Sequence, residues 1–347
     1  LMSNEASHRT SVIHGKHRWT WAETYIRCCR FASALSKRGI GKGDTVSVMA
    51  PNIPAIFEAH FGVLMTGAVL NTLNIRMEAE TLANIFEHAE TKVLLTDREC
   101  SPQIKVALSK VKRDILVIDI DDPETDSGEY LGMLEYEAFL SEGDPEFEAV
   151  LPEDDWQAVS LNYTSGTTGI PKGVVYHTRG AYLLATGNVL AWEMPHRPVY
   201  LWTLPMFHCN GWCFPWTITM LGGTHVCLRK VTAKNIYNSI AEHHVTHFCG
   251  APIVMNMISN APKEEQRELP HRVEIMTAAA PPPPTVIAQM EEAGFNVTHV
   301  YGLTETTPLI AICEPRALHM DLSIEERAKI KARQGIELIS SGELKVV

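Results

Sequence analysis

Residues Tyr163 to Gly173 read Tyr-Thr-Ser-Gly-Thr-Thr-Gly-Ile-Pro-Lys-Gly and directly follow an apolar segment, Ala158–Leu161. Hydroxyl groups can donate hydrogen bonds to an anion, and glycines let backbone N–H groups approach it closely. A proline before the lysine and two valines after it favour a turn between strands over the helix start that follows an ordinary P-loop lysine. The run therefore predicts a phosphate-binding hairpin, with a polar surface turn as the alternative. Its candidate ligands are Thr164, Ser165, Gly166, Thr167, Thr168, Gly169 and Lys172.

Helix-like and strand-like segments alternate on both sides of this hairpin. Helical periodicity marks residues 21–38, 53–65, 234–243 and 284–293, and short apolar runs mark 45–49, 92–96, 115–118, 245–249 and 273–277. Such alternation is typical of parallel sheets covered by helices, so the sequence predicts the α/β class. The acidic stretch 119–154 breaks the rhythm and indicates a surface loop with some local helix.

A second polar segment, Tyr301-Gly-Leu-Thr-Glu-Thr306, follows the strand-like stretch Asn296–Val300. Ligands of open α/β sheets lie beyond the carboxyl ends of strands, so this segment and the hairpin could face one site. Glu305 is a natural Mg²⁺ ligand, because hard cations prefer carboxylate and phosphate oxygens. Thr304 could donate to a phosphate, and the Tyr301 ring could lie against a base. The alternative is that Thr304 and Glu305 cap the next element.

A third segment, Leu204-Pro-Met-Phe-His-Cys-Asn-Gly-Trp212, places a histidine and a tryptophan after an apolar run. On its own, His208 is more typical of a hydrogen-bonded core residue than of a catalyst. Trp212, together with Phe214 and Trp216, could likewise fill a core.

These three segments, in this order and spacing, resemble the signature segments of the adenylate-forming superfamily, and most closely the plant acyl-activating enzymes and bacterial fatty acyl-CoA ligases. The resemblance extends from Trp19-Thr-Trp-Ala-Glu23 to Ala332-Arg-Gln-Gly335. It implies two helix-covered, mostly parallel sheets within one large N-terminal AMP-binding domain, residues 1–347. One subdomain would span 51–199 and carry the phosphate loop. The other would combine 1–50 with 200–347, and ATP would bind between them.

The resemblance also implies a role for each candidate residue. The hairpin, including Lys172, would hold the β- and γ-phosphates, Thr304 the α-phosphate and Glu305 the Mg²⁺. His208 would contact the acyl carboxylate without acting as a base, since a carboxylate is already ionised near neutral pH. Trp212 would gate the acyl tunnel. Residues that would line the nucleotide and acyl pockets are Ala278, Ala279, Ala280, Pro281, His299, Val300, Tyr301 and Gly302.

The implied activity is that of an acid-thiol ligase. ATP and a fatty or aromatic acid would give an acyl-AMP, from which coenzyme A, as co-substrate, would take the acyl group. Members of the superfamily continue with a Thr-Gly-Asp segment, a hinge and a C-terminal domain that carries a catalytic lysine. We therefore expect this chain to be a truncated form that is largely inactive by itself. The alternatives are an amino-acid adenylation domain, a non-catalytic nucleotide- or acyl-adenylate-binding module, and a luciferase-like oxygenase.

Composition sets further bounds. With 347 residues, 45% of them hydrophobic, the chain can bury a core of about two domain-sized units. Its net charge of −11 argues against nucleic acid as the main partner. No apolar run approaches the roughly 20 residues of a membrane span. The eight cysteines form no Cys-x-x-Cys pair, which suits reduced, buried thiols. We expect a cytoplasmic or peroxisomal protein, for which a homodimer is allowed.

Overall fold

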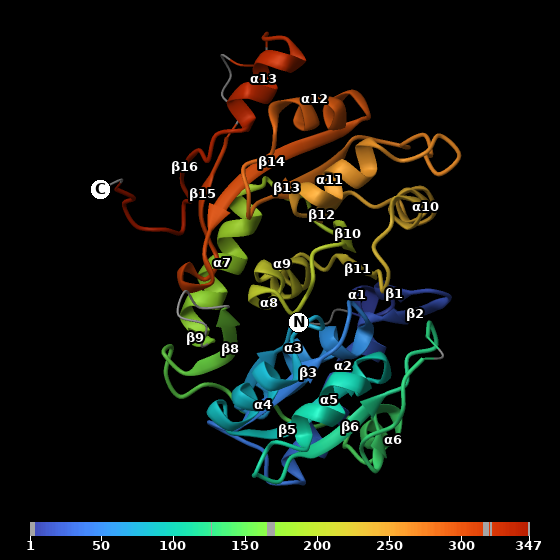
Figure 1. Ribbon diagram of the computed structural model, residues 1–347, viewed down its shortest axis with the longest axis vertical. Helices are drawn as coiled ribbons and strands as arrows, with labels where there is room; N and C mark the ends of the chain where they lie inside the picture. Colours follow the sequence, from blue (N-terminus) through green and yellow to red (C-terminus); the bar gives the residue numbers. More distant parts are fainter. Residues whose placement is uncertain (1–3, 126, 165–170, 315–318, 320, 346–347) are drawn as a thin grey trace. The chain divides into compact units, whose positions relative to one another are not determined.

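The computed structural model describes residues 4–125, 127–164, 171–314, 319 and 321–345. The chain divides into two compact units, and Figure 1 draws each with colours that follow the sequence. Unit 1 comprises residues 1–182 and 205–211, and unit 2 comprises residues 183–204 and 212–347. The chain therefore passes from one unit to the other at 182/183, 204/205 and 211/212.

Unit 1 is built around a sheet with the strand order β7-β6-β5-β3-β4-β8-β9. Every neighbouring pair is parallel except β8 and β9, which form an antiparallel hairpin. Two groups of helices accompany it, α2 with α3 and α6, and α4 with α5. The elements are α1 (Asn4–Ser7), β1 (Thr10–His14), β2 (His17–Thr20), α2 (Trp21–Ser36), β3 (Thr45–Met49), α3 (Pro54–Met65), β4 (Val69–Thr72), α4 (Ala79–His88), β5 (Thr91–Asp97), η1 (Arg98–Cys100), α5 (Ser101–Leu108), β6 (Leu116–Ile120), β7 (Leu134–Glu135), α6 (Tyr136–Ser141), β8 (Ala158–Thr164) and β9 (Lys172–His177).

Within unit 2, the strands of a second sheet follow the order β16-β15-β14-β13-β12-β10-β11. Its strands are parallel from β14 to β11 and antiparallel at β14–β15 and β15–β16. Helix α7 (Thr178–Ala191) spans the first passage between units, and the short α8 (Cys209–Trp212) spans the third. The remaining elements are β10 (Val199–Trp202), α9 (Phe214–Met220), β11 (Thr224–Cys227), α10 (Ala233–His243), β12 (His247–Cys249), α11 (Pro252–Ser259), β13 (Val273–Thr277), α12 (Pro284–Glu292), β14 (Phe295–Gly302), η2 (Thr304–Thr306), β15 (Leu309–Ile312), α13 (Ile324–Lys331) and β16 (Ile336–Glu337).

The predicted class is confirmed, because both sheets are mostly parallel and carry helices. Local signals explain several boundaries. Helix α2 begins at a capping box in which the Thr20 hydroxyl accepts the Glu23 N–H and the Glu23 carboxylate accepts the Thr20 N–H. Proline occupies the first helical turn of α3, where its missing N–H costs nothing. The predicted hairpin around the phosphate loop is present, with Tyr163 opposite Gly173 and Thr164 opposite Lys172.

The stretch 119–154 differs from the predicted surface loop. Its residues Leu134–Glu135 add the edge strand β7, and α6 follows. Asp119 is fully buried, and its carboxylate accepts the backbone N–H groups of Leu131 and Gly132. Asp119 thus holds a loop against the sheet, although it lies in an acidic stretch whose charge pattern predicts solvent-exposed side chains.

The boundaries of the predicted subdomains, residues 51–199 and residues 1–50 with 200–347, stay a prediction. Residues 1–50 group with unit 1, because β3 pairs with β4 and β5 and α2 packs on α3. The assignment of the phosphate loop and the acyl pocket to separate subdomains stays a prediction.

The side chains of the core are mainly aliphatic and aromatic. All eight cysteines are buried free thiols. Among the described helices, none combines the length and the apolarity that crossing a bilayer would require.

A buried histidine of α3 gives unit 1 an expected pH dependence. His60 is fully buried, and burial lowers its pKa from 6.5 to about 4. Below pH 6.5 the unfolded chain binds a proton that the folded chain excludes, so stability falls as pH falls from 6.5 towards 4. The slope from one such group approaches about 1.4 kcal/mol per pH unit.

Replacing His60 with glutamine, which keeps hydrogen-bonding capacity without titrating, should flatten this dependence. Urea unfolding at pH 7 and pH 4.5 should show that the wild type loses roughly 1–3 kcal/mol more than His60→Gln over this interval. Equal losses in the two proteins would contradict a neutral, buried His60.

Candidate active site

The described part of the phosphate loop lies at the carboxyl end of β8 in unit 1. Tyr163 is half-buried, its pKa is raised by burial to about 12, and its hydroxyl is 2.6 Å from Nδ1 of His88 at the end of α4. Lys172, the first residue of β9, is exposed. Pro171 is described, whereas Ser165, Gly166, Thr167, Thr168 and Gly169 lie outside the described residues. The structure thus fixes both ends of the loop, and the ligand roles of its interior stay predictions.

The contact between Tyr163 and His88 anchors the strand from which the loop starts. Tyr163→Phe removes this hydrogen bond while keeping the ring, and we expect it to lower the free energy of unfolding by about 1 kcal/mol. Urea denaturation measures this. Tyr182→Phe is a suitable control, because that ring is 63% exposed. An equally small effect from both substitutions would mean that the anchor contributes nothing.

The segment around His208 also belongs to unit 1. The backbone N–H of Met206 donates to Oδ1 of Asn52 over 2.8 Å, and the Thr72 hydroxyl donates to the Phe207 carbonyl over 3.0 Å. His208 itself is accessible to solvent, yet surrounding protein atoms desolvate it enough to lower its pKa. A neutral imidazole at this position can donate a hydrogen bond to a carboxylate ligand, and it does not need to act as a base.

The next five residues form a left-handed turn. Cys209, Asn210, Gly211, Trp212 and Cys213 all have positive φ, between 42° and 63°. This conformation costs non-glycine L-residues roughly 1–2 kcal/mol each, with asparagine the best tolerated. Successive residues in this region require compensating contacts.

Asn210 supplies such contacts through a buried polar cluster that the sequence analysis did not identify. Its Oδ1 accepts hydrogen bonds from Ser160 Oγ over 2.6 Å and from Asn162 Nδ2 over 2.7 Å. Asn210 and Ser160 are fully buried and Asn162 is 3% exposed. The available signal was the spacing of Ser160 and Asn162, because residues two apart in a strand point to the same face.

Trp212, the first residue of this turn in unit 2, is only 5% exposed. Asn188 Nδ2 donates to its carbonyl over 3.0 Å. The neighbouring Phe214 stacks on Tyr200 and meets Trp192 edge-on, so this stretch contributes to an aromatic core. The geometry agrees with the core alternative for Trp212, and a gating role stays a prediction.

The Tyr301–Glu305 segment begins with the last two residues of β14 in unit 2 and continues beyond the strand. Gly302 lies so close to the Pro308 carbonyl that a Cβ there would be 1.6 Å from its oxygen, which explains why glycine occupies this position. The Leu303 N–H donates to the Thr306 hydroxyl over 2.9 Å, so Thr306 provides the local capping contact. Glu305 is exposed, and within the described part of the chain its carboxylate has no hydrogen-bond or ion-pair partner. Its oxygens therefore suit a hard cation such as Mg²⁺.

The segment Ala278–Pro281 follows β13, which is the parallel neighbour of β14, with Thr277 opposite His299. Both segments thus start from the carboxyl ends of adjacent parallel strands. Ala278 is buried, whereas Ala279, with a φ of +80°, and the next two residues, Ala280 and Pro281, are exposed. This arrangement presents backbone and small side chains after the end of β13, and the Tyr301 ring, near the end of the neighbouring β14, is 37% exposed.

His299 and Val300 differ from these exposed residues. Both are nearly fully buried, and His299 Nδ1 donates to the Arg333 carbonyl over 2.8 Å. Burial lowers the pKa of His299, an effect that hydrogen bonds to the backbone of residues 331–333 oppose. The side chain of His299 therefore holds the chain after α13 against β14. A ligand contact by His299 or Val300 stays a prediction.

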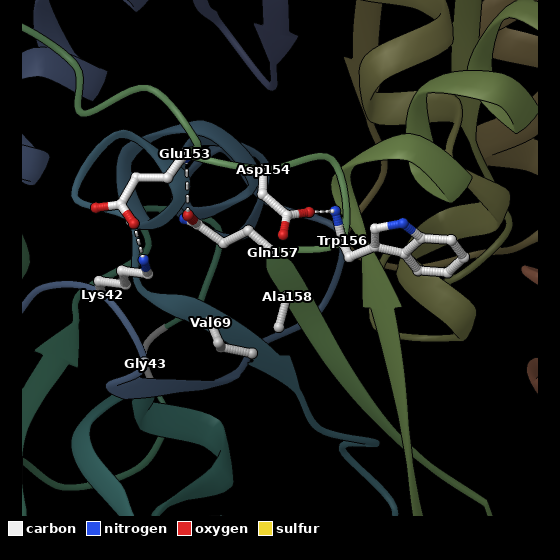
Figure 2. A pocket seen from close by; sticks show the side chains of 9 residues that line it. Lys42, Gly43, Val69, Glu153, Asp154, Trp156, Gln157 and Ala158 are labelled. Carbon is white, nitrogen blue, oxygen red and sulfur yellow. Dashed lines mark hydrogen bonds and ion pairs between the residues drawn. The ribbon is translucent and has the colours of Figure 1, made fainter.

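A separate pocket of about 310 Å³ lies in unit 1, at the end of the sheet opposite to the phosphate loop (Figure 2). It is lined by Val69 and Ala158, the first residues of β4 and β8, so it lies at the amino ends of these parallel strands. Its polar groups are engaged with one another: Lys42 pairs with Glu153, whose N–H donates to Gln157. Because nucleotide sites of α/β sheets lie beyond carboxyl ends, this pocket is not a candidate for the phosphate site.

Two helix-covered α/β sheets carry hydroxyl, glycine and carboxylate segments at their carboxyl strand ends, which is where open α/β sheets bind their ligands. The chain belongs to the AMP-binding enzyme family, whose sequence model matches residues 3–347.

The curated relatives that it matches include CoA ligases. It is 49% identical, over 98% of its length, to a peroxisomal acetate/butyrate–CoA ligase of Arabidopsis thaliana. It is 43% identical, over 96% of its length, to a peroxisomal trans-cinnamate:CoA ligase of Petunia hybrida. The chain covers 62% and 61% of these relatives, so it spans about three fifths of their length.

Solved structures support the fold. The N-terminal domain of FACL13 from Mycobacterium tuberculosis superposes with a TM-score of 0.80 at 23% identity, covering 96% of this chain and 79% of that one. O-succinylbenzoate coenzyme A synthetase from Bacillus subtilis, solved in complex with AMP, gives a TM-score of 0.75 at 24% identity, covering 96% and 62%. The predicted architecture of two helix-covered, mostly parallel sheets is confirmed by this shared fold.

Proposed function

We propose that the full-length protein is an acyl-CoA synthetase that activates a carboxylic acid with ATP and transfers the acyl group to coenzyme A. The observation that carries this proposal is the 49% identity to an acetate/butyrate–CoA ligase over 98% of the chain. Family membership across residues 3–347 supports the nucleotide requirement.

In the first step, a carboxylate oxygen of the acid attacks the α-phosphorus of ATP. The bond from that phosphorus to the bridging oxygen breaks, and pyrophosphate leaves with the electron pair. In the second step, the thiol sulfur of coenzyme A attacks the acyl carbon and displaces AMP. Both reactants of the first step are anions, so donors and cations must offset their repulsion.

The candidate residues divide this task. The hydroxyls and N–H groups of residues 164–169, with Lys172, would bind the β- and γ-phosphates, and Thr304 would donate to the α-phosphate. Glu305 would hold Mg²⁺, which when bound offsets the charge of the phosphates. His208 would contact the acid carboxylate, and its lowered pKa supports a neutral hydrogen-bonding role. Catalysis would come mostly from placing the two anions together in a favourable field.

The ligand-lining roles of Ala278–Pro281, Tyr301 and Gly302 for adenine, and of Trp212 and Val300 for the acyl group, belong to this proposal. The relatives named for acetate, butyrate and trans-cinnamate favour small or aromatic acids as substrates. A peroxisomal or cytoplasmic location and a homodimer are further parts of the proposal, and two relatives named as peroxisomal support the first.

The test is a pyrophosphate-release screen on the full-length protein, with ATP, Mg²⁺ and coenzyme A, across acids from acetate to palmitate and cinnamate. We expect acid-dependent release with short-chain or aromatic acids, and formation of the matching thioester by mass spectrometry. Amino acids serve as the comparison set. Release with amino acids only would replace the proposal with amino-acid adenylation, and release with no acid would overturn it.

A further inference from the structure

The feature that leads beyond the proposed function is the left-handed turn after His208. The first three of its five positive-φ residues, Cys209 to Gly211, belong to unit 1, together with His208. A run of this kind in L-residues is unfavourable by itself, so something must hold it. Asn210, at the second position, is the buried side chain that connects this turn to the sheet.

The hydrogen bonds around Asn210 are directional, and all of them fit one orientation of its amide. Oδ1 accepts from Ser160 and Asn162, while Nδ2 lies 3.4 Å from Nε2 of His60. His60 Nδ1 is 2.7 Å from the Ile56 carbonyl and must donate to it, so Nε2 of a neutral ring carries the lone pair that accepts from Asn210. Burial keeps His60 neutral, since its pKa is lowered to about 4. An amide satisfies this set of partners, and neither a carboxylate nor an apolar side chain could.

Two partners of Asn210 lie on the strand that leads into the phosphate loop. Ser160 and Asn162 are residues of β8, which ends at Thr164, the first residue of that loop. His208 stands two residues before Asn210. One buried amide therefore ties together the segment proposed to contact the acid carboxylate and the strand proposed to position the phosphates.

We propose that Asn210 is a positioning residue for adenylate formation, which fixes the His208 segment relative to the phosphate loop by clamping the left-handed turn to β8. This inference rests on the proposed function. It assigns Asn210 no contact with substrate. Its effect is on the relative placement of two reacting anions, which matters most in the transition state.

The experiment uses the full-length protein and the best acid from the screen. We expect Asn210→Ala to lower kcat for pyrophosphate release roughly 30- to 100-fold, because a displacement of about 1 Å can cost that much. The KM values for ATP and for the acid should change less than about threefold, since each binding segment remains intact. Asn162→Ala removes one of the same hydrogen bonds from the strand side. It should lower kcat in the same way. If Asn210→Ala does not fold, Asn162→Ala still tests the proposal.

Two control variants separate positioning from general stability. Asn71→Ala deletes another fully buried asparagine of the same sheet, whose Nδ2 donates to the Ser47 hydroxyl over a distance of 3.0 Å. Asn71 of β4 lies opposite Leu161 of β8, so its side chain is on the other face of the sheet from Ser160 and Asn162. It should lower Tm by a similar amount and leave kcat within about twofold at 25 °C. Asn210→Gly accepts positive φ freely but lacks the amide. It should be as slow as Asn210→Ala if the clamp matters, and should recover the wild-type kcat if only the backbone conformation does.

The outcomes are distinct. A selective loss of kcat in Asn210→Ala, Asn210→Gly and Asn162→Ala, with Asn71→Ala near the wild type, supports the inference. Recovery of kcat in Asn210→Gly, or equal losses in Asn71→Ala and Asn210→Ala, overturns it while leaving the proposed function intact. A wild-type protein that releases no pyrophosphate with any acid overturns the proposed function itself, before any variant is compared.

Discussion

Replacing Glu305 with glutamine is expected to slow pyrophosphate release by the full-length protein roughly 100- to 1,000-fold. Glutamine keeps the length and shape of the side chain but removes the charge. The Glu305 carboxylate is exposed and has no partner among the described residues, so the substitution should change the free energy of unfolding very little. The effect should therefore be confined to catalysis and to Mg²⁺ binding. The apparent affinity for Mg²⁺ should fall together with the rate.

A readout other than turnover makes this prediction sharper. MgATP should raise the Tm of the wild type more than ATP with EDTA does, and Glu305→Gln should lose most of that difference. Glu292→Gln, which neutralises an exposed carboxylate at the end of α12, is the matched control and should behave like the wild type. A Glu305→Gln protein with normal rate and normal Mg²⁺ dependence would remove Glu305 from the metal site.

The second large effect is expected from Arg27→Ala, and it concerns folding. The Nε–H group of Arg27 in α2 donates to the carboxylate of Glu58 in α3 over 2.6 Å, and Nη2 also donates to the carboxylate of the exposed Glu137. The Glu58 side chain is 2% exposed, and Tyr136 donates its hydroxyl to the same carboxylate over 2.7 Å. Removing the arginine leaves a buried carboxylate without its cation, which should cost about 3–5 kcal/mol of unfolding free energy.

The pH dependence identifies the cause. Burial raises the pKa of Glu58, and Arg27 opposes that shift. Without Arg27 the pKa of Glu58 should rise further. The folded state would then keep the Glu58 carboxyl protonated up to a higher pH than the unfolded state does. Stability then falls as pH rises through that range, and the deficit of Arg27→Ala should be largest at pH 7–8 and shrink towards pH 5.

Urea unfolding across this pH range measures the deficit. Glu137→Gln removes the exposed partner of Arg27 and should cost no more than about 1 kcal/mol, because its side chain is 61% exposed. A deficit in Arg27→Ala that is equally small, or independent of pH, would contradict the buried-charge explanation.

Several strands, and the hairpin that carries the phosphate loop, could be predicted because their signals are local. Apolar runs at 45–49 and 273–277 became β3 and β13 with the expected bounds, and Pro171 with the valines after Lys172 indicated the hairpin. Buried parallel strands appear in a sequence as continuous apolar segments bounded by turn residues, so they can be recognised from a single sequence.

The contacts that hold the His208 segment could not be predicted in the same way. Asn210 meets Ser160 and Asn162 across about 50 positions of sequence, and nothing local distinguishes it from an asparagine in a surface turn. Asp119 was placed in a surface loop because charge is normally solvated, yet it is buried against two backbone N–H groups. For His299, the sequence indicated a pocket position, whereas its partner, the Arg333 carbonyl, depends on tertiary packing.

The eight buried thiols have a practical consequence for testing the proposed thioester formation. Coenzyme A carries a free thiol that thioester formation consumes, and a chromogenic disulfide reagent can follow its disappearance. Thiols enclosed in a folded interior react slowly with such reagents. The native residues 1–347 should therefore add little background colour, and a slow rise in absorbance without substrate would report the opening of the protein.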